Sequence, residues 1–421
     1  MENKVIKGRL QKLRAVMKEK KIDYYMMPTA DFHNSEYVND YFKVREYFCN
    51  FSGSNGTLLV WQEGAGLWTD GRYFIQAERE LEGTGVTLFR MLDAGVPTIV
   101  EFLQQNMKES QTLGFDGRVI PTKEGCEYEK KLTEKKIKFS IEEDLAEAIW
   151  EDRPEFPAGK VMVLKEEITG KSFEKKREEV MEKVREEDAQ SLLLTKLDDI
   201  MWLLNIRGCD VECNPVAMSY LYLSGDSTVL FIQRRALDAT AEAYLLSQGI
   251  QIEEYASVTE YLKKLPAGGH VMLDKKQCSY YLYKILADRQ TLVEKQNPTE
   301  LLKAVKNPAE LANMEKIYLK DSVALTKFIY WLKTNIGKQE ITEVTAADKL
   351  EAFRREIPEF FDLSFPSISA YGANAAMMHY EPTRENFSVM KPEGMYLIDS
   401  GGQYFGGTTN ETKTVNVGAL T

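Results

Sequence analysis

The chain has 421 residues, of which 43% are hydrophobic and 28% are charged, and its formal net charge is −11. This is ordinary globular composition, and the length predicts two or three domains, each with a sizeable core. The acidic balance, with lysines and arginines interspersed among acids, argues against nucleic acid or an anionic membrane as a partner. No apolar run approaches the roughly 18 residues that cross a bilayer.

The beginning of the chain and its cysteines favour a cytoplasmic protein. The first residues lead directly into a charged amphipathic segment, with no secretory signal. Five cysteines are scattered along the sequence, and only Cys209 and Cys213 lie close together. No second Cys or His pair completes a zinc site. We therefore expect reduced thiols and a cytoplasmic location.

The first third of the chain predicts an α/β domain. Apolar residues recur at helical spacing over residues 4–20, and residues 23–28 (DYYMMP) form a short apolar run typical of a buried strand. Residues 57–61 and 66–70 are strand-like, and helix and strand patterns alternate to about residue 137. The segment Trp150–Gly159 has two prolines, a glycine and no periodicity, as expected for a linker.

The second third repeats the beginning of the first. Residues 10–31 run from a helical pattern into YYMMPTAD, and residues 173–198 run from a helical pattern into SLLLTKLD. Each unit has a helix, a buried strand, a threonine and then an aspartate two or three residues on. The pattern favours two copies of one α/β unit. The alternative is that the similarity is one shared by any α/β domain.

The last third begins after a second linker, Gln296 to Pro298. Asn307, Pro308 and Glu310 form a capping-box arrangement that predicts the start of a long helix. A second helix is expected over residues 345–356, followed by strands over 368–371, 376–380 and the 396–415 region. We expect three domains, comprising residues 1–156, 157–297 and 298–421.

Residues 396–415 (YLIDSGGQYFGGTTNETKTV) carry the most informative chemistry. Two β-prone runs joined by a glycine-rich connection predict a hairpin, with Asp399 at the end of the first run. A buried carboxylate is costly unless it is paired or bound to a cation, although a turn aspartate is an alternative. The glycines lack the spacing and the lysine of a phosphate loop. Taken alone, His379 fits a structural or surface histidine better than a functional one.

Blocks along nearly the whole chain resemble the Xaa-Pro aminopeptidase (aminopeptidase P) family of M24B metallopeptidases, within the creatinase and pita-bread superfamily. The blocks are FSGSNGT, TDGRYFIQAERE, TKLDDIMWLLNIRGCDVECNPV, LLKAVKNPAELANM, FPSISAYGANAAMMHYEPT and YLIDSGGQYFGGTTNETKTV. The resemblance implies two creatinase-like α/β domains, followed by the N-terminal part of an α+β pita-bread catalytic domain. It also implies release of the first residue of short peptides with proline second, two divalent metal ions (typically Mn²⁺) and a homodimer.

The same resemblance assigns roles to individual residues. Asp399 matches the first aspartate metal ligand, and His379 matches the histidine that contacts the substrate beside the metals. Asn410 falls where the family has a second aspartate that bridges both metals, and strand alternation points the adjacent Glu411 to the opposite face. The later ligands of the family, one histidine and two glutamates, would lie beyond Thr421.

Two functional readings follow from these matches. A neutral amide at Asn410 and few ligands are too little to hold two dications. We therefore expect a C-terminally incomplete aminopeptidase that is inactive by itself. The alternative is a non-catalytic, aminopeptidase-like module that binds peptides or proteins.

Overall fold

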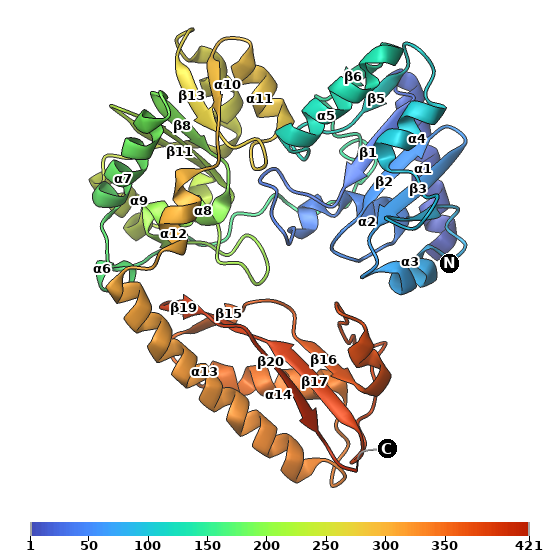
Figure 1. Cartoon of the computed structure of the whole chain (residues 1–421), viewed down its shortest axis with the longest axis vertical. Coiled ribbons are helices and arrows are strands. Elements are labelled where there is room, and N and C mark those ends of the chain that lie inside the picture. Colours follow the sequence, from blue (N-terminus) through green and yellow to red (C-terminus); the bar gives the residue numbers. More distant parts are fainter. Residues whose placement is uncertain (1, 420–421) are drawn as a thin grey trace. The chain divides into compact units, whose positions relative to one another are not determined.

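The computed structural model describes residues 2–419, and these fall into two compact units (Figure 1). Unit 1 extends to Met162 and also includes Phe173–Val211 and Val216–Lys303. Unit 2 comprises Val163–Ser172, Glu212–Pro215 and the chain from Ala304 onward. The fold class predicted from the sequence, α/β followed by α+β, is confirmed.

The first part of unit 1 is a mixed sheet with helices on both faces. Its strand order is β4-β3-β2-β1-β5-β6. The strands are β1 (Tyr24–Pro28), β2 (Thr57–Trp61), β3 (Gly64–Thr69), β4 (Thr87–Arg90), β5 (Thr112–Gly114) and β6 (Lys138–Ser140). The helices are α1 (Glu2–Glu19), α2 (Val44–Cys49), α3 (Phe74–Leu81), α4 (Ile99–Asn106) and α5 (Thr122–Leu132), with short 3₁₀ turns η1 (Asp40–Phe42) and η2 (Thr133–Lys135).

The second part of unit 1 repeats this design. Its sheet has the order β12-β11-β10-β8-β13-β14. The strands are β8 (Ser191–Leu194), β10 (Ser219–Ser224), β11 (Thr228–Ile232), β12 (Gln251–Glu254), β13 (His270–Leu273) and β14 (Thr291–Glu294). The helices are α7 (Phe173–Glu186), α8 (Leu197–Leu204), α9 (Ala239–Ser247), α10 (Val258–Lys264), α11 (Tyr280–Ala287) and α12 (Pro298–Ala304), with turns η3 (Arg234–Ala236) and η4 (Tyr255–Ser257).

The two sheets of unit 1 also have the same strand directions. In each sheet the first strand pairs antiparallel with the second and parallel with the fifth, and the third pairs parallel with the fourth. The remaining pairs, antiparallel between second and third and parallel between fifth and sixth, also agree. The repeat predicted from two short sequence patterns is therefore a repeat of the whole sheet.

Strand β1 lies in the middle of its sheet, and its sequence is a continuous apolar run. Tyr25 and Met27 pack in a cluster that contains residues of α1, α2 and α3. Tyr24 and Met26 point to the other face, in a cluster with residues of α4 and α5. Because helices cover both faces, every residue of Tyr24–Met27 is buried and no polar alternation remains.

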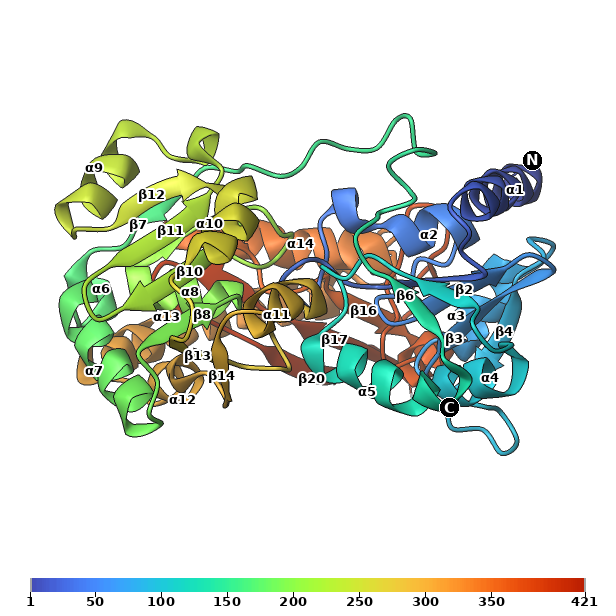
Figure 2. The same cartoon turned by 90° about the horizontal axis from the view of Figure 1, so that it is seen from above.

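The two sheets of unit 1 are joined by α5 and α11, which lie side by side (Figure 2). The Thr122 hydroxyl and backbone N–H both donate to the Cys278 carbonyl oxygen, at 2.8 and 2.9 Å. A second junction is the buried His33, whose Nδ1 lies 2.8 Å from the Thr195 carbonyl oxygen and whose Nε2 lies 2.7 Å from the Tyr255 hydroxyl.

Unit 2 packs two helices against an antiparallel sheet of order β16-β17-β20 (Figure 1). The helices are α13 (Pro308–Asn335) and α14 (Glu343–Arg355), and α13 begins with the predicted capping box at Asn307. The strands are β16 (Ile368–Tyr371), β17 (Met395–Ser400) and β20 (Glu411–Asn416). A smaller sheet of order β15-β18-β19 is formed by β15 (Phe360–Leu363), β18 (Gly402–Tyr404) and β19 (Gly407–Thr408). The remaining short elements are β7 (Met162–Val163), α6 (Glu166–Thr169), β9 (Ile206–Arg207) and η5 (Gly372–Ala376).

Two expectations for this last part need correction. Strands β17 and β20 pair antiparallel as predicted, but the connection between them is itself a hairpin, β18–β19, that joins another sheet. Residues 376–380, expected to be a strand, instead comprise the last residue of η5 and the turn that follows it. Their apolar residues do not pair in a sheet, because Tyr380 is held by a side-chain bond to α14.

Candidate metal site and its surroundings

Asp399 lies in β17, the central strand of its sheet. Tyr396 and Ile398 point toward α13 and α14 and are part of the unit 2 core. Strand alternation therefore places Asp399 on the face away from the helices. In the register Asp399 lies opposite Ile368 on one side and opposite Thr412 on the other. The exposed Thr412 leaves this face open toward solvent.

One oxygen of this carboxylate lacks a partner. Asp399 Oδ1 is shielded from solvent, and none of the described residues donates a hydrogen bond to it. Buried polar atoms are normally paired, and an unpaired one costs free energy that a ligand or cation can recover. A carboxylate oxygen is a ligand that hard divalent cations prefer. Asp399 therefore has the chemistry of a metal ligand.

Asn410 lies close to Asp399 along the same ladder. It is exposed and immediately precedes β20. Continuing the alternation of β20 by one residue puts Asn410 on the face of Thr412, and hence of Asp399. Glu411 faces the helices instead, where its Oε1 accepts a hydrogen bond of 2.8 Å from Ser322 Oγ of α13. The carboxylate next in sequence to Asn410 therefore does not replace it on the open face.

The glycine-rich connection holds these strands in register. A Cβ on Gly401 would collide with the Thr409 carbonyl oxygen and with Ser364 Oγ. The Ser364 hydroxyl donates to that same carbonyl at 2.9 Å, and the Gly402 N–H donates to Thr409 Oγ1 at 2.9 Å. The glycine thus permits the close approach of its backbone to that of Thr409.

A buried ion pair anchors the β18–β19 hairpin to the helices. Arg354 Nε of α14 donates to Asp321 Oδ1 of α13 at 2.7 Å, and neither side chain is exposed. The Tyr404 hydroxyl of β18 donates to the same oxygen at 2.6 Å. Burial and the Asp321 carboxylate raise the pKa of Tyr404, so this phenol remains a donor. The sequence offered no local sign of this cluster, whose members are far apart in the chain.

His379 belongs to a different part of the same unit. It is exposed and lies in the turn after η5, directly before the buried Tyr380. The strand that leads into this turn ends at Tyr371, which pairs with Tyr396, whereas Asp399 pairs with Ile368 at the other end of that ladder. The structure therefore brings Asp399 and Asn410 together on one face and places His379 in the adjoining loop.

The described residues contain no group of three His, Cys, Asp or Glu side chains arranged to hold a metal ion. On the face of Asp399 they supply one carboxylate and one amide. Two dications need several anionic oxygens, so these residues by themselves do not fit a two-metal site. Asp399, with its unpaired oxygen, fits a single ligand position in such a site.

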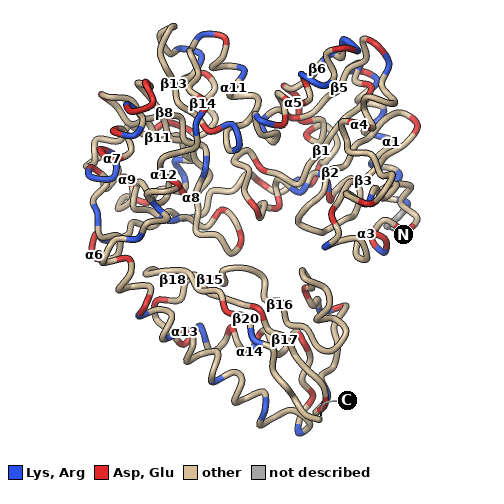
Figure 3. The backbone as a smooth tube through the Cα atoms, viewed as in Figure 1, with Lys and Arg blue, Asp and Glu red and all other residues tan. Residues whose placement is uncertain are grey.

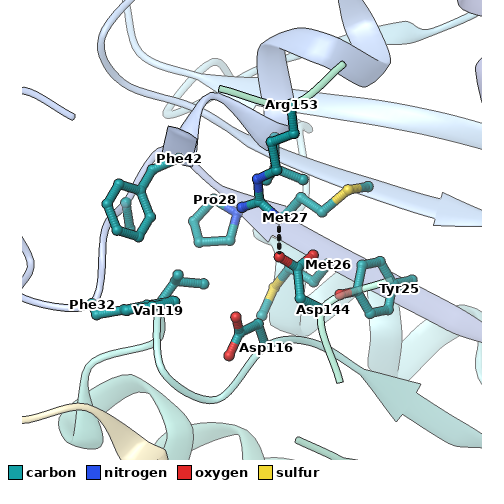
Figure 4. A pocket seen from close by; sticks show the side chains of 12 residues that line it. Tyr25, Met26, Met27, Pro28, Phe32, Phe42, Asp116, Val119, Asp144 and Arg153 are labelled. Carbon is teal, nitrogen blue, oxygen red and sulfur yellow. Dashed lines mark hydrogen bonds and ion pairs between the residues drawn. The ribbon is translucent and has the colours of Figure 1, made fainter. Parts of the chain in front are cut away.

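A pocket in unit 1 is separate from these residues (Figure 4). It lies against β1, and Arg153 Nη1 donates to Asp144 Oδ2 at 2.6 Å on its wall. Its lining consists of Tyr25, Met26, Met27, Pro28, Ala30, Phe32, Phe42, Val44, Asp116, Val119, Asp144 and Arg153. Both carboxylates are already paired with arginines, so the pocket offers no free charge for a ligand.

The described chain has the mixed charges and the moderate hydropathy that its composition predicts. Basic and acidic residues are interspersed along both units (Figure 3). The helices within residues 2–419 include none with the length and hydropathy of a membrane span.

The creatinase-type repeat and the aspartate-bearing sheet define a class of protein, and comparisons with known families identify the same class. The Creatinase/Prolidase N-terminal domain matches residues 9–147 and again residues 152–310. Metallopeptidase family M24 matches residues 312–421.

Comparisons with individual proteins point to a narrower family. Xaa-Pro aminopeptidase 1 of Dictyostelium discoideum is 36% identical over 429 residues, covering 99% of this chain and 68% of the relative. A probable Xaa-Pro aminopeptidase P of Tuber melanosporum is 36% identical, covering 100% of this chain and 71% of the relative. The X-prolyl aminopeptidase of Caenorhabditis elegans, described as a cytosolic enzyme with a di-nuclear active site, superimposes with a TM-score of 0.91 at 31% identity. That match covers 97% of this chain and 69% of the worm protein.

The chain belongs to the Xaa-Pro aminopeptidase family. The resemblance carried by the sequence blocks is thereby confirmed.

Proposed function

We propose that this protein is an Xaa-Pro aminopeptidase-type metallopeptidase, acting on short peptides that have proline as the second residue. Asp399 is its first metal ligand, Asn410 stands at the position of the second metal carboxylate, and His379 contacts the peptide. The observation that carries this proposal is the unpaired, buried Oδ1 of Asp399 on a face that it shares with Asn410.

We further propose that the 421-residue chain by itself does not hydrolyse such peptides. A pair of divalent ions supplies an activated water and charge stabilisation for this reaction, and it needs anionic oxygens around it. The amide of Asn410 provides one neutral oxygen and cannot bridge two ions as a carboxylate does. No catalytic step is therefore assigned to this chain alone.

A peptide-cleavage assay tests this proposal. The purified chain, incubated with Mn²⁺ and the tripeptide Ala-Pro-Ala, is expected to release no free alanine above the metal-free control. Mn²⁺-dependent release of alanine, lost in the Asp399→Asn variant, would contradict the predicted inactivity and would support the assignment of Asp399.

A non-catalytic peptide-binding module is the second candidate, and Asn410 is the observation that favours it. In that case Ala-Pro-Ala binds without metal, and the Asp399→Asn substitution leaves its affinity unchanged. For the metallopeptidase, affinity for the peptide depends on added Mn²⁺. Isothermal titration calorimetry of peptide binding, with and without EDTA, distinguishes the two candidate functions.

We also propose the finer attributes that the family resemblance implies. These are Mn²⁺ as the metal, a cytoplasmic location, a homodimer, and domains comprising residues 1–156, 157–297 and 298–421. The five cysteines of the sequence lie among the described residues and form no disulfide there, which supports a reducing compartment. Light scattering after size-exclusion chromatography tests the dimer. Limited proteolysis tests the domain boundaries, which predict cleavage near residues 156 and 297.

A further inference from the structure

Glu343, the first residue of α14, is a fully buried carboxylate on which several donors converge. Its Oε1 accepts hydrogen bonds from the Tyr371 backbone N–H at 2.6 Å and from Asn374 Nδ2 at 3.1 Å. Its Oε2 accepts from the Tyr380 hydroxyl and the Ser388 backbone N–H, each at 2.7 Å, and also from Asn374 Nδ2 at 3.2 Å. Both carboxylate oxygens therefore accept more than one hydrogen bond.

The two backbone donors require a hydrogen-bond acceptor at each oxygen of Glu343. The N–H groups of Tyr371 and Ser388 can only donate, and they meet different oxygens of Glu343. An amide side chain has one acceptor oxygen and would turn its own N–H₂ group toward one of these donors. The N-terminus of α14, capped by Thr342, adds a favourable field for a negative charge. Burial and the Glu343 carboxylate raise the pKa of Tyr380, so its hydroxyl stays a donor.

The groups bound to Glu343 bracket one segment, residues 372–388, which we call the 372–388 loop. Tyr371 immediately precedes the loop, Ser388 ends it, and Tyr380 lies at its middle. The Glu343 backbone N–H also donates to the Ser388 carbonyl oxygen, at 3.1 Å. His379 is the residue before Tyr380, so the bond from Tyr380 to Glu343 fixes the backbone that carries the imidazole.

We propose that Glu343 is a positioning residue, which closes the 372–388 loop and thereby holds His379 ready to contact a bound peptide. The part played by His379 rests on the proposed function. The ordering of the loop by Glu343 stands on the hydrogen bonds alone. Substrate recognition in this protein thus depends on a buried glutamate that touches no substrate.

Hydrogen exchange measured by mass spectrometry tests the ordering of the loop. In the Glu343→Gln variant the amides of residues 372–388 are expected to exchange about 10- to 100-fold faster, because buried donors lose their acceptor. The strands β17 and β20 should keep their protection. Glu340→Gln, an exposed change of the same kind three residues earlier, is the matched control and should have no effect. Unchanged exchange of the loop in Glu343→Gln would overturn the proposal.

A second readout reports on His379 itself. The sequence contains only three histidines, so the imidazole resonances form a simple NMR spectrum in which His379→Gln identifies one signal. Glu343→Gln should shift or broaden that signal and leave those of His33 and His270 in place. An unmoved His379 signal would overturn the positioning role, even if the variant were less stable.

Milder variants cover the case in which Glu343→Gln does not fold. Tyr380→Phe and Asn374→Ala each remove one side-chain donor and leave the carboxylate with its backbone partners. Each should accelerate exchange in the 372–388 loop by a few-fold to about tenfold. If neither does so, the proposal fails without any measurement on Glu343→Gln.

Addition of Ala-Pro-Ala with Mg²⁺, a diamagnetic ion that does not broaden nearby resonances as Mn²⁺ does, separates this inference from the proposed function. A shift of the His379 signal in the wild-type chain, reduced in Glu343→Gln, supports both. No shift in the wild type contradicts peptide contact by His379, while the exchange measurements still decide whether Glu343 orders the loop.

Discussion

Asp399 and Thr412 lie opposite each other across the β17–β20 ladder, and their shared face also receives Asn410. This register places a carboxylate with an unpaired oxygen beside an amide, where two carboxylates would hold metal ions. Under the proposed function this hairpin carries the metal ligands, and Asn410 is the one side chain that departs from that role.

Gly401 permits this register, so its substitution should disrupt unit 2. The Cβ of Gly401→Ala would collide with the Thr409 carbonyl oxygen, which is backbone and cannot move aside. We expect a loss of about 1–3 kcal/mol in the free energy of unfolding, as for other overpacked sites. Fluorescence of Trp331, the one tryptophan numbered within unit 2, reports this in urea. Gly225→Ala, where a Cβ meets nothing within 4 Å, should be neutral.

The buried ion pair should be sensitive to the loss of either partner. Arg354→Met leaves the Asp321 carboxylate buried and uncompensated, and we expect a cost of about 3–5 kcal/mol. Tyr404→Phe removes only one neutral donor to that carboxylate and should cost about 1–3 kcal/mol. Urea unfolding monitored at Trp331 gives both values. Equal costs for the two variants would show that the charge pair is not the dominant interaction.

His33 predicts a pH dependence for unit 1. Burial lowers the pKa of His33 below its ordinary value of 6.5, with the nearby Asp31 opposing the shift. The unfolded chain therefore binds a proton at this residue before the folded chain does. Stability is fully present above about pH 7 and falls as the pH drops through 6.5 toward the lower folded pKa. The urea midpoint should decrease from pH 7.5 to 5.5, and His33→Gln should flatten that decrease. An identical slope in the variant would assign the effect to other groups.

Unit 2 should unfold separately from unit 1. Strands β16 and β20 lie at the edges of its sheet, and β20 exposes Thr412, Lys413 and Thr414. Bare edges and a small core predict a lower melting temperature. Differential scanning calorimetry should show a low transition followed by a higher one. A single cooperative transition at high temperature would count against this prediction.

Local sequence patterns predicted much of the fold but only part of the site. The capping box at Asn307 and the apolar run of β1 are local, and both appear as expected. Asp399 stands out in the sequence because it ends an apolar run, and its role as a metal ligand stays a prediction. Glu343 was missed because its donors lie 28 to 45 residues away in the sequence, and no local pattern records such contacts. Residues 376–380 were misassigned as a strand for the same reason.

The role of the open face can be measured directly by Mn²⁺ binding, using isothermal titration calorimetry on the 421-residue chain. We predict weak binding by the wild-type chain, loss of that binding in Asp399→Asn, and clearly tighter binding in Asn410→Asp, because a second carboxylate then shares the face. Binding that is unaffected by Asp399→Asn, or an Asn410→Asp variant with unchanged affinity, would contradict the assignment of these two residues to the metal site.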